Sequence, residues 1–207
     1  LSNVLIQASI NSFGDVAMAG SAAASNIEGF VYVAMNAFYQ AAITFTSQNV
    51  GAGKYHRVKP IMIRTVLCVT VTGLVLGNLA YRFGNVLLLF YTSNPAVVVE
   101  GLRRLSYVSA WYFICGIMDT LVGILRGLGY SIVPMLVSLI GACGLRIVWV
   151  MTIFQIPILH TLDIIYLSYP VTWLITAGTH FICYLVIMKK LKDKAAKSKQ
   201  EAVLAQK

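Results

Sequence analysis

Two acidic side chains stand well inside long apolar segments of this sequence, Glu28 and Asp119. A carboxylate is costly to hold far from water, so a carboxylate in a membrane segment is by default a functional residue. It can bind an ion, relay a proton or hold a cationic group. We therefore expect Glu28 and Asp119 to be the candidates for ion coupling or for pairing with a substrate charge.

The helix that carries Glu28 has a polar and aromatic face. Side chains at helical spacing from Glu28 share one side of that helix. Aromatic rings attract cations, so this face suits a cavity for amphipathic organic cations. The alternative is a polar patch in the outer leaflet where Glu28 is hydrated. The candidate cavity-lining residues on this face are Tyr32, Asn36, Tyr39 and Gln40, with Met35 among them.

Asp119 has its own helical face, which includes Tyr112 and Arg126. Tyr112 is the fifth candidate for lining the cavity. The alternative role for Asp119 is an ion pair with Arg126 or Arg146 that holds the helices together, because buried membrane charges usually pair. Arg146 lies near the middle of its apolar segment, and we expect it to be a structural intramembrane charge that faces the protein interior.

The composition indicates a membrane protein. The chain has 207 residues, of which 58% are hydrophobic and 11% are charged, and its mean hydropathy is +0.78. Soluble domains carry about 25% charged residues. The net charge of +9 comes from basic residues gathered beside apolar segments, which argues against nucleic-acid binding. No nucleophile with a suitable base and no cluster of metal ligands is evident, so we expect neither an enzyme nor a metal site.

The apolar pattern predicts an all-α integral membrane bundle of five complete transmembrane helices plus the end of a sixth. The run from Leu1 to Phe13 is too short to cross a bilayer, which needs about 20 residues. We expect 1–190 to form a transmembrane lobe and 191–207 a basic cytoplasmic tail, either a frayed helix or disordered. We also expect Pro95–Arg104 to lie along the membrane surface. The five predicted spans are about 16–50, 61–81, 105–125, 132–158 and 162–188.

The distribution of basic residues predicts the orientation. Alternating spans place the loop at Lys54, Arg126 and the tail after Met188 on one side, which holds twelve Lys and Arg residues. The opposite side holds Arg82, Arg103 and Arg104. Cytoplasmic loops carry the excess of positive charge, so the C-terminus is expected in the cytoplasm.

Several short motifs, in this order, resemble the multidrug and toxic compound extrusion (MATE) family. They are Asn-Ser-Phe-Gly at 11–14, Asn-Ile-Glu at 26–28, Ser-Gln-Asn-Val-Gly-Ala-Gly-Lys at 47–54, Leu-Arg-Gly-Leu-Gly-Tyr at 125–130, Pro134 and Leu-Arg-Ile at 145–147.

The resemblance implies a twelve-helix transporter of two six-helix lobes, of which this chain is similar to the second, from the end of helix 7 to helix 12. It implies cation antiport, with Na⁺ or H⁺ as the coupling ion and no cofactor, that expels cationic and amphipathic compounds by alternating access. The implied partners are the lipid bilayer and a missing N-terminal lobe of the same polypeptide, and the implied location is the plasma membrane.

The resemblance also bears on the site. Some members hold the cation with acids on helices 7 and 10, and Asp119 stands on the equivalent of helix 10, about one turn from the family position near Cys115. Two alternatives remain open. A lipid-linked oligosaccharide flippase of the same superfamily would carry many more basic residues in its cavity, whereas Arg146 is the only base expected deep in a segment. A non-transporting membrane scaffold subunit would need no interior acids.

Overall fold

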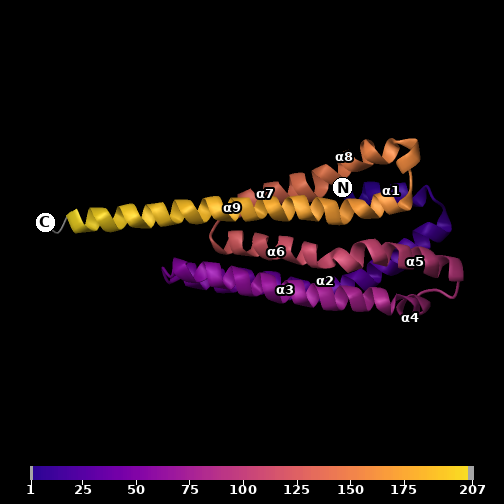
Figure 1. Ribbon diagram of the computed structural model, residues 1–207, viewed down its shortest axis with the longest axis horizontal. Coiled ribbons are helices and arrows are strands. Elements are labelled where there is room, and N and C mark those ends of the chain that lie inside the picture. Colours follow the sequence, from indigo (N-terminus) through magenta and orange to yellow (C-terminus); the bar gives the residue numbers. More distant parts are fainter. Residues whose placement is uncertain (1, 205–207) are drawn as a thin grey trace.

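The protein is an elongated bundle of long helices that run along one common axis (Figure 1). The computed structural model describes residues 2–204, and it describes side chains as far as residue 193. Within these residues the chain forms helices and turns without a β-strand, as the apolar pattern predicts. The helices are α1 (Ser2–Asn11), α2 (Asp15–Gly51), α3 (Val58–Arg82), α4 (Gly84–Leu89), α5 (Pro95–Val108), α6 (Tyr112–Gly127), α7 (Ile132–Ser138), α8 (Leu145–Met151) and α9 (Leu162–Leu204).

Four helical segments of the described chain are long and apolar enough to cross a membrane: Tyr55–Arg82, Pro95–Gly127, Ile132–Gln155 and Leu162–Asp193. Helix α2 has 37 residues, or roughly 55 Å at 1.5 Å per residue, which exceeds the ~30 Å hydrocarbon core. Its polar side chains lower its hydropathy. The membrane bundle is thus confirmed, with α2 as a fifth segment long enough to span.

The segment before the predicted span 105–125 differs from our expectation. Pro95–Arg104 does not lie along the surface but belongs to α5, which continues through a short 3₁₀ turn into α6. Asn94 caps α5, because its side-chain oxygen accepts a hydrogen bond from the Ala96 amide at 3.0 Å, and Pro95 suits the first helical turn. The helical segment therefore begins ten residues before the expected Leu105.

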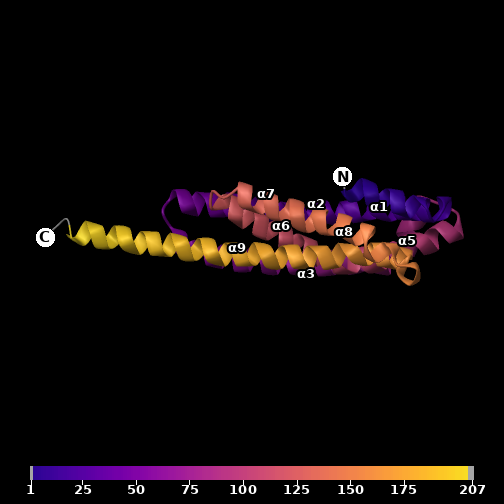
Figure 2. The same ribbon diagram turned by 90° about the horizontal axis from the view of Figure 1, so that it is seen from above.

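Helix α6 is the central helix of the bundle. It packs against α2, α3 and α9, and Figure 2 shows α1 and α2 on one side and α3 and α9 on the other. Glycines allow the close approach that their four-residue spacing indicates. A Cβ added at Gly123 would lie 2.8 Å from the Tyr39 carbonyl oxygen, and one at Gly127 would lie 2.6 Å from the Thr46 Cβ.

Two turns of the same geometry close one end of the bundle (Figure 1). Gly53 (φ 71°) follows α2 and Gly129 (φ 90°) follows α6. In each turn the next amide reaches back five residues: Lys54 donates to the Asn49 carbonyl at 2.8 Å and Tyr130 to the Leu125 carbonyl at 3.0 Å. This is the Schellman helix ending, which favours glycine. Two of the motifs behind the family resemblance are therefore helix caps.

The last two spans differ in regularity. Helices α7 and α8 are joined by a π-helical stretch at Leu139–Gly144, and Arg146 is the second residue after it. Helix α9 is continuous and extends to Leu204, so the expected basic tail begins as helix. Residues 205–207 of that tail lie outside the described residues.

Candidate functional site

A buried ion pair between α2 and α5 forms the centre of the candidate site. The Arg104 guanidinium donates to both Glu28 carboxylate oxygens, from Nε at 3.0 Å and from Nη2 at 2.7 Å, and its Nη1 donates to Ser21 Oγ at 2.9 Å. Glu28 is 4% exposed and Arg104 is 5% exposed. A bidentate pair of this kind is short and directional. The hydrated alternative for Glu28 is therefore wrong.

Arg104 was not expected inside the protein. The charge pattern places Arg104 on the outer surface and leaves Arg146 as the only base deep in a segment. The burial of Arg104 contradicts both predictions. Tyr166 and Tyr169 of α9 lie within cation–π range, with ring centroids 5.8 and 5.5 Å from the guanidinium carbon. Arg104 thus connects α2, α5 and α9.

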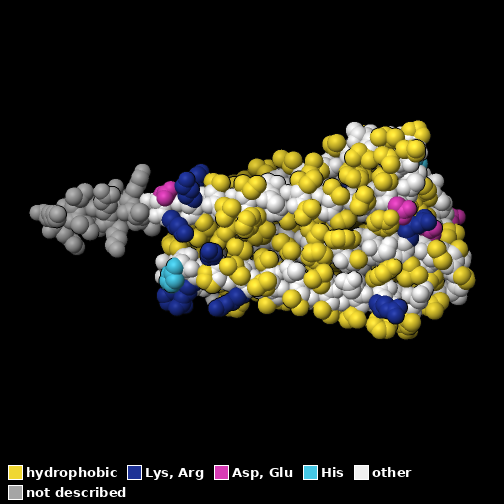
Figure 3. Space-filling view, viewed as in Figure 1, with side chains coloured by type: hydrophobic (Ala, Val, Ile, Leu, Met, Phe, Trp, Pro, Cys, Tyr) yellow, Lys and Arg dark blue, Asp and Glu magenta, His cyan; other side chains and the backbone are white. Residues whose placement is uncertain are grey.

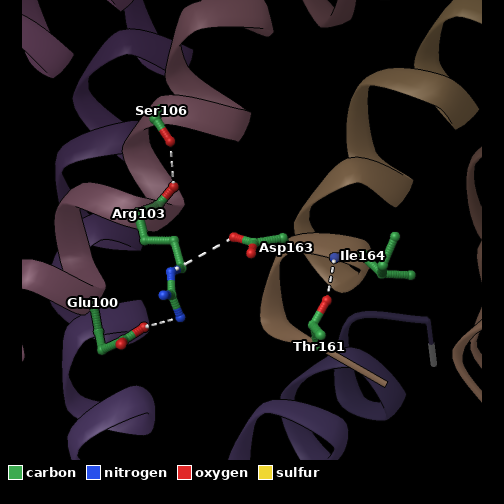
Figure 4. A network of polar contacts seen from close by, with 6 residues as sticks. All are labelled: Glu100, Arg103, Ser106, Thr161, Asp163 and Ile164. Atoms are coloured by element: carbon green, nitrogen blue, oxygen red, sulfur yellow. Dashed lines mark hydrogen bonds and ion pairs between the residues drawn. The ribbon is translucent and has the colours of Figure 1, made fainter. Parts of the chain in front are cut away.

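Its neighbour Arg103 shows the contrast. The Arg103 side chain is 42% exposed, and it lies 3.2 Å from Glu100 and 3.6 Å from Asp163 of α9 (Figure 4). Exposed ion pairs contribute roughly 0–1 kcal/mol. The two adjacent arginines therefore do different work, since Arg103 belongs to a surface network while Arg104 neutralises a buried acid.

Beside the ion pair lies a pocket of about 290 Å³ with polar and aromatic walls. Its aromatic rings are in mutual contact: the centroid of Trp173 is 5.3 Å from that of Tyr112 and 5.6 Å from that of Tyr169. Such rings suit the flat or cationic part of an organic molecule. The lining residues are Asn3, Ser25, Glu28, Gly29, Tyr32, Arg104, Val108, Tyr112, Tyr169 and Trp173.

Asp119 is half-buried on α6, and the Tyr32 side chain extends toward it. Among the described residues no Lys, Arg or His nitrogen lies within 4.0 Å of its carboxylate. The ion pair considered for Asp119 with Arg126 or Arg146 is therefore not formed. Arg126 instead donates to the Tyr39 hydroxyl at 2.6 Å.

Arg146 lies inside the protein, as expected, but with neutral partners. It donates from Nη1 to Asn3 Oδ1 at 3.3 Å and from Nη2 to Thr172 Oγ1 at 3.2 Å. Its guanidinium carbon is 4.2 Å from the Tyr169 ring centroid, close enough for a strong cation–π contact. The Nε has no hydrogen-bond partner in the described part of the chain. Among the described residues, no carboxylate oxygen lies within 4.0 Å of Arg146.

The structure brings three of the predicted site residues together, because Glu28, Tyr32 and Tyr112 line one pocket. The remaining residues on that face of α2 do not line it: Tyr39 pairs with Arg126, Asn36 is half-buried, and Gln40 is exposed.

Sequence reasoning missed Arg104, Tyr169 and Trp173, all of which line the pocket. A signal for Arg104 was available. Val97, Gly101 and Arg104 are four and three residues apart, which places Arg104 on the buried face of a helix.

The side chains of the site could bind charged groups. Two carboxylates, two buried guanidinium groups and several aromatic rings surround or adjoin the pocket. In the described residues, His, Cys, Asp and Glu side chains form no group of three that could hold a metal ion.

Comparison with known proteins adds a family and a fold. The MatE family model matches residues 1–152. The chain is 28% identical over 141 residues to the probable multidrug resistance protein YpnP of Bacillus subtilis (strain 168). It is similar in fold to the Vibrio cholerae MATE transporter VcmN in its bent form (20% identity, TM-score 0.77) and to a point mutant of that transporter (19% identity, TM-score 0.80).

These matches cover most of this chain but less than half of each relative. The alignment with YpnP takes in 68% of this chain and 32% of YpnP. The two VcmN structures match 91% of this chain and 42% of their own length. This chain therefore corresponds to part of a longer transporter fold.

Proposed function

This chain belongs to the MatE family, and on that premise we propose that it forms one lobe of a secondary active multidrug transporter. The lobe exports organic cations and amphipathic compounds in exchange for Na⁺ or H⁺. The name of the B. subtilis relative and the fold shared with VcmN support the proposal. So does the pocket, whose tyrosine and tryptophan rings stand beside acidic side chains.

The observation that carries the proposal is the environment of Asp119. This half-buried carboxylate has no basic group within 4.0 Å among the described residues, and Tyr32, which lines the pocket, extends toward it. Glu28, in contrast, is already neutralised by Arg104. Asp119 is therefore the acid free to take up a coupling ion, and Glu28 is the acid that a substrate cation reaches only in competition with Arg104.

We propose the following cycle. An organic cation lies against Tyr32, Tyr112 and Trp173 and is held by the negative charge of Asp119. Binding of Na⁺ or H⁺ at Asp119 in the outward-facing state removes that attraction and releases the cation. A ligand shifts a conformational equilibrium only through differential affinity for its states, and the change of charge at Asp119 supplies that difference.

The complete transporter requires a second lobe, which we propose lies N-terminal to this one in the same polypeptide. Residues 1–190 make up the membrane lobe and 191–207 the basic tail. We propose that the protein resides in the plasma membrane with the C-terminus in the cytoplasm. The end of the bundle that carries Lys54, Arg126 and Lys189 then faces the cytoplasm.

The test is efflux of a fluorescent organic cation by the complete transporter in cells that lack their own exporters. Asp119→Asn should lower efflux at least tenfold at unchanged expression, because the coupling charge is lost. Glu28→Gln should lower efflux as well. Asp163→Asn is the matched control, since Asp163 is an acid on the exposed network of Figure 4. Wild-type efflux by Asp119→Asn would refute the proposal.

A second candidate function rests on the uncompensated charge of Arg146. A lipid-linked oligosaccharide flippase needs basic residues to meet pyrophosphate, and this lobe buries two, Arg104 and Arg146. Glu28 neutralises the first, which leaves a single base for an anionic group. Reconstituted vesicles separate the two functions: the transporter should move the fluorescent cation and leave a lipid-linked pyrophosphate sugar in its original leaflet.

A further inference from the structure

A groove lies between α3 and α9. Figure 2 shows these two helices on the side of the bundle away from α1 and α2. Helix α6 packs against both α3 and α9 and forms the floor of the groove through Ile117 and Leu121. Two hollows make up the groove, one of about 740 Å³ and one of about 300 Å³, and both are lined by Met62 and Phe181. The shared residues mean that the two hollows are adjacent along the groove.

The wider hollow is basic at its mouth. Lys59 of α3 and Lys189 and Lys192 of α9 line it, with Asp193 as the acid among its lining residues. Three positive charges against one negative charge leave the mouth attractive to an anion. Tyr55 lies there as well, and tyrosine is enriched at the level of lipid headgroups. The mouth therefore has the composition of a site for an anionic headgroup.

The rest of the groove is apolar and has the length of one leaflet. The lining of α9 runs from Leu174 to Leu185, which are eleven helical steps apart. That is about 16 Å of helix, against ~15 Å for half of the hydrocarbon core. The flanking surfaces of α3 and α9 expose large apolar side chains, and Figure 3 shows them as a band that ends at basic residues. A water-soluble partner has no access to such a band.

We propose that this groove binds one anionic phospholipid of the leaflet at the basic end. The phosphate lies among Lys59, Lys189 and Lys192, and one acyl chain lies along α6 between α3 and α9. Lysines beside a membrane surface attract anionic headgroups. The lipid fills the space that separates α3 from α9 and so ties the two helices to the central helix.

Native mass spectrometry of the complete transporter tests the headgroup contacts. The protein is purified in detergent with equal amounts of phosphatidylglycerol and phosphatidylethanolamine. Wild type should retain phosphatidylglycerol preferentially, and the triple variant Lys59→Gln/Lys189→Gln/Lys192→Gln should retain at least fivefold less. The control Lys54→Gln/Arg57→Gln/Arg64→Gln removes equal charge from the same end outside the groove and should retain the lipid within twofold.

The acyl contact has its own test. Gly178 lines the groove, and a Cβ added there meets no atom within 4 Å, so Gly178→Phe fills the groove without a clash at the backbone. It should lower phosphatidylglycerol retention at least fivefold, whereas Ile182→Phe, on the exposed face of the same helix, should not. Glycerol 3-phosphate at millimolar concentration should not displace the lipid, since it lacks the acyl chain.

Equal retention by the two triple variants would overturn the proposal. So would loss of the lipid in the lysine variant with full retention in Gly178→Phe, because the lipid would then lie outside the groove. Size-exclusion profiles confirm that each variant is folded before it is measured. Lipid retention requires no transport, so this result stands apart from the outcome of the efflux test.

Discussion

At the scale of residues, the bidentate contact between Glu28 and Arg104 links two helices, and the two residues are 76 positions apart in the sequence. Breaking a buried ion pair by removing one partner costs about 3–5 kcal/mol, because the other charge stays buried without compensation. Arg104→Gln should therefore lower the free energy of unfolding by about this amount, measured by denaturant titration of the protein in detergent.

The double variant measures the interaction between the two charges separately from their other contacts. In Glu28→Gln/Arg104→Gln neither charge remains, so stability should recover by at least half of the single-variant loss. Arg103→Gln is the control, and its effect should stay below about 1 kcal/mol because that side chain is on the surface. Additive losses in the double variant would show that the two side chains act independently.

Only part of the candidate site could be predicted from the sequence at the scale of residues. Spacing placed Glu28 and Tyr32 on one face, and the structure puts both in one pocket. The partner of Glu28 could not be predicted, because it stands in a segment that reads as amphipathic: Glu100 and Arg103 are on its outer side while Arg104 is on its inner side. Periodicity tells which residues share a face, but it does not tell which helix that face meets.

At the scale of helices, the contact between α2 and α6 depends on Gly123. A Cβ at this position would lie 2.8 Å from the Tyr39 carbonyl oxygen, a backbone atom that cannot turn away. Gly123→Ala should therefore force α2 and α6 apart and lower the free energy of unfolding by about 1–3 kcal/mol. Thermal unfolding followed by helical circular dichroism measures the loss.

The control for this prediction is Gly178→Ala on α9, where an added Cβ meets no atom within 4 Å. Alanine is the better helix former by about 1 kcal/mol in a helix interior, so this variant should be neutral or slightly more stable. A loss at Gly178→Ala equal to that at Gly123→Ala would mean that helix approach is not the cause.

The helices themselves were largely predictable from hydropathy, glycine and proline. The predicted span 16–50 differs from α2 by one residue at each end. The boundary of α5 was missed for a physical reason. Its three charged residues suggested a solvent-exposed segment, whereas the helix has one exposed face and one buried face. The mean hydropathy of the segment does not distinguish the two faces.

At the scale of the whole molecule, charge asymmetry predicts how the bundle crosses the membrane. Burial of Arg104 leaves Arg82 and Arg103 at the end opposite the twelve basic residues, which sharpens the contrast. In a variant without its native cysteines, Asn94→Cys should react with a membrane-impermeant maleimide on intact cells. Lys54→Cys should react only after permeabilisation. The reverse pattern of labelling would show that the C-terminus lies outside the cell.

The identity of the coupling ion is a property of the complete transporter. We expect the proton to be the ion that binds at Asp119. Hard cations such as Ca²⁺ and Mg²⁺ take six or more oxygen ligands. The Tyr32 hydroxyl lies toward the Asp119 carboxylate. A proton needs only the carboxylate, and intramembrane acids commonly relay protons.

Vesicles of the complete transporter should therefore export the fluorescent cation when the medium outside is made acidic at equal sodium. They should not do so under a sodium gradient at equal pH. Asp119→Asn should abolish the response to pH, because the site that takes up the proton is gone. Efflux driven by sodium alone would contradict proton coupling and would require further oxygen ligands from the second lobe.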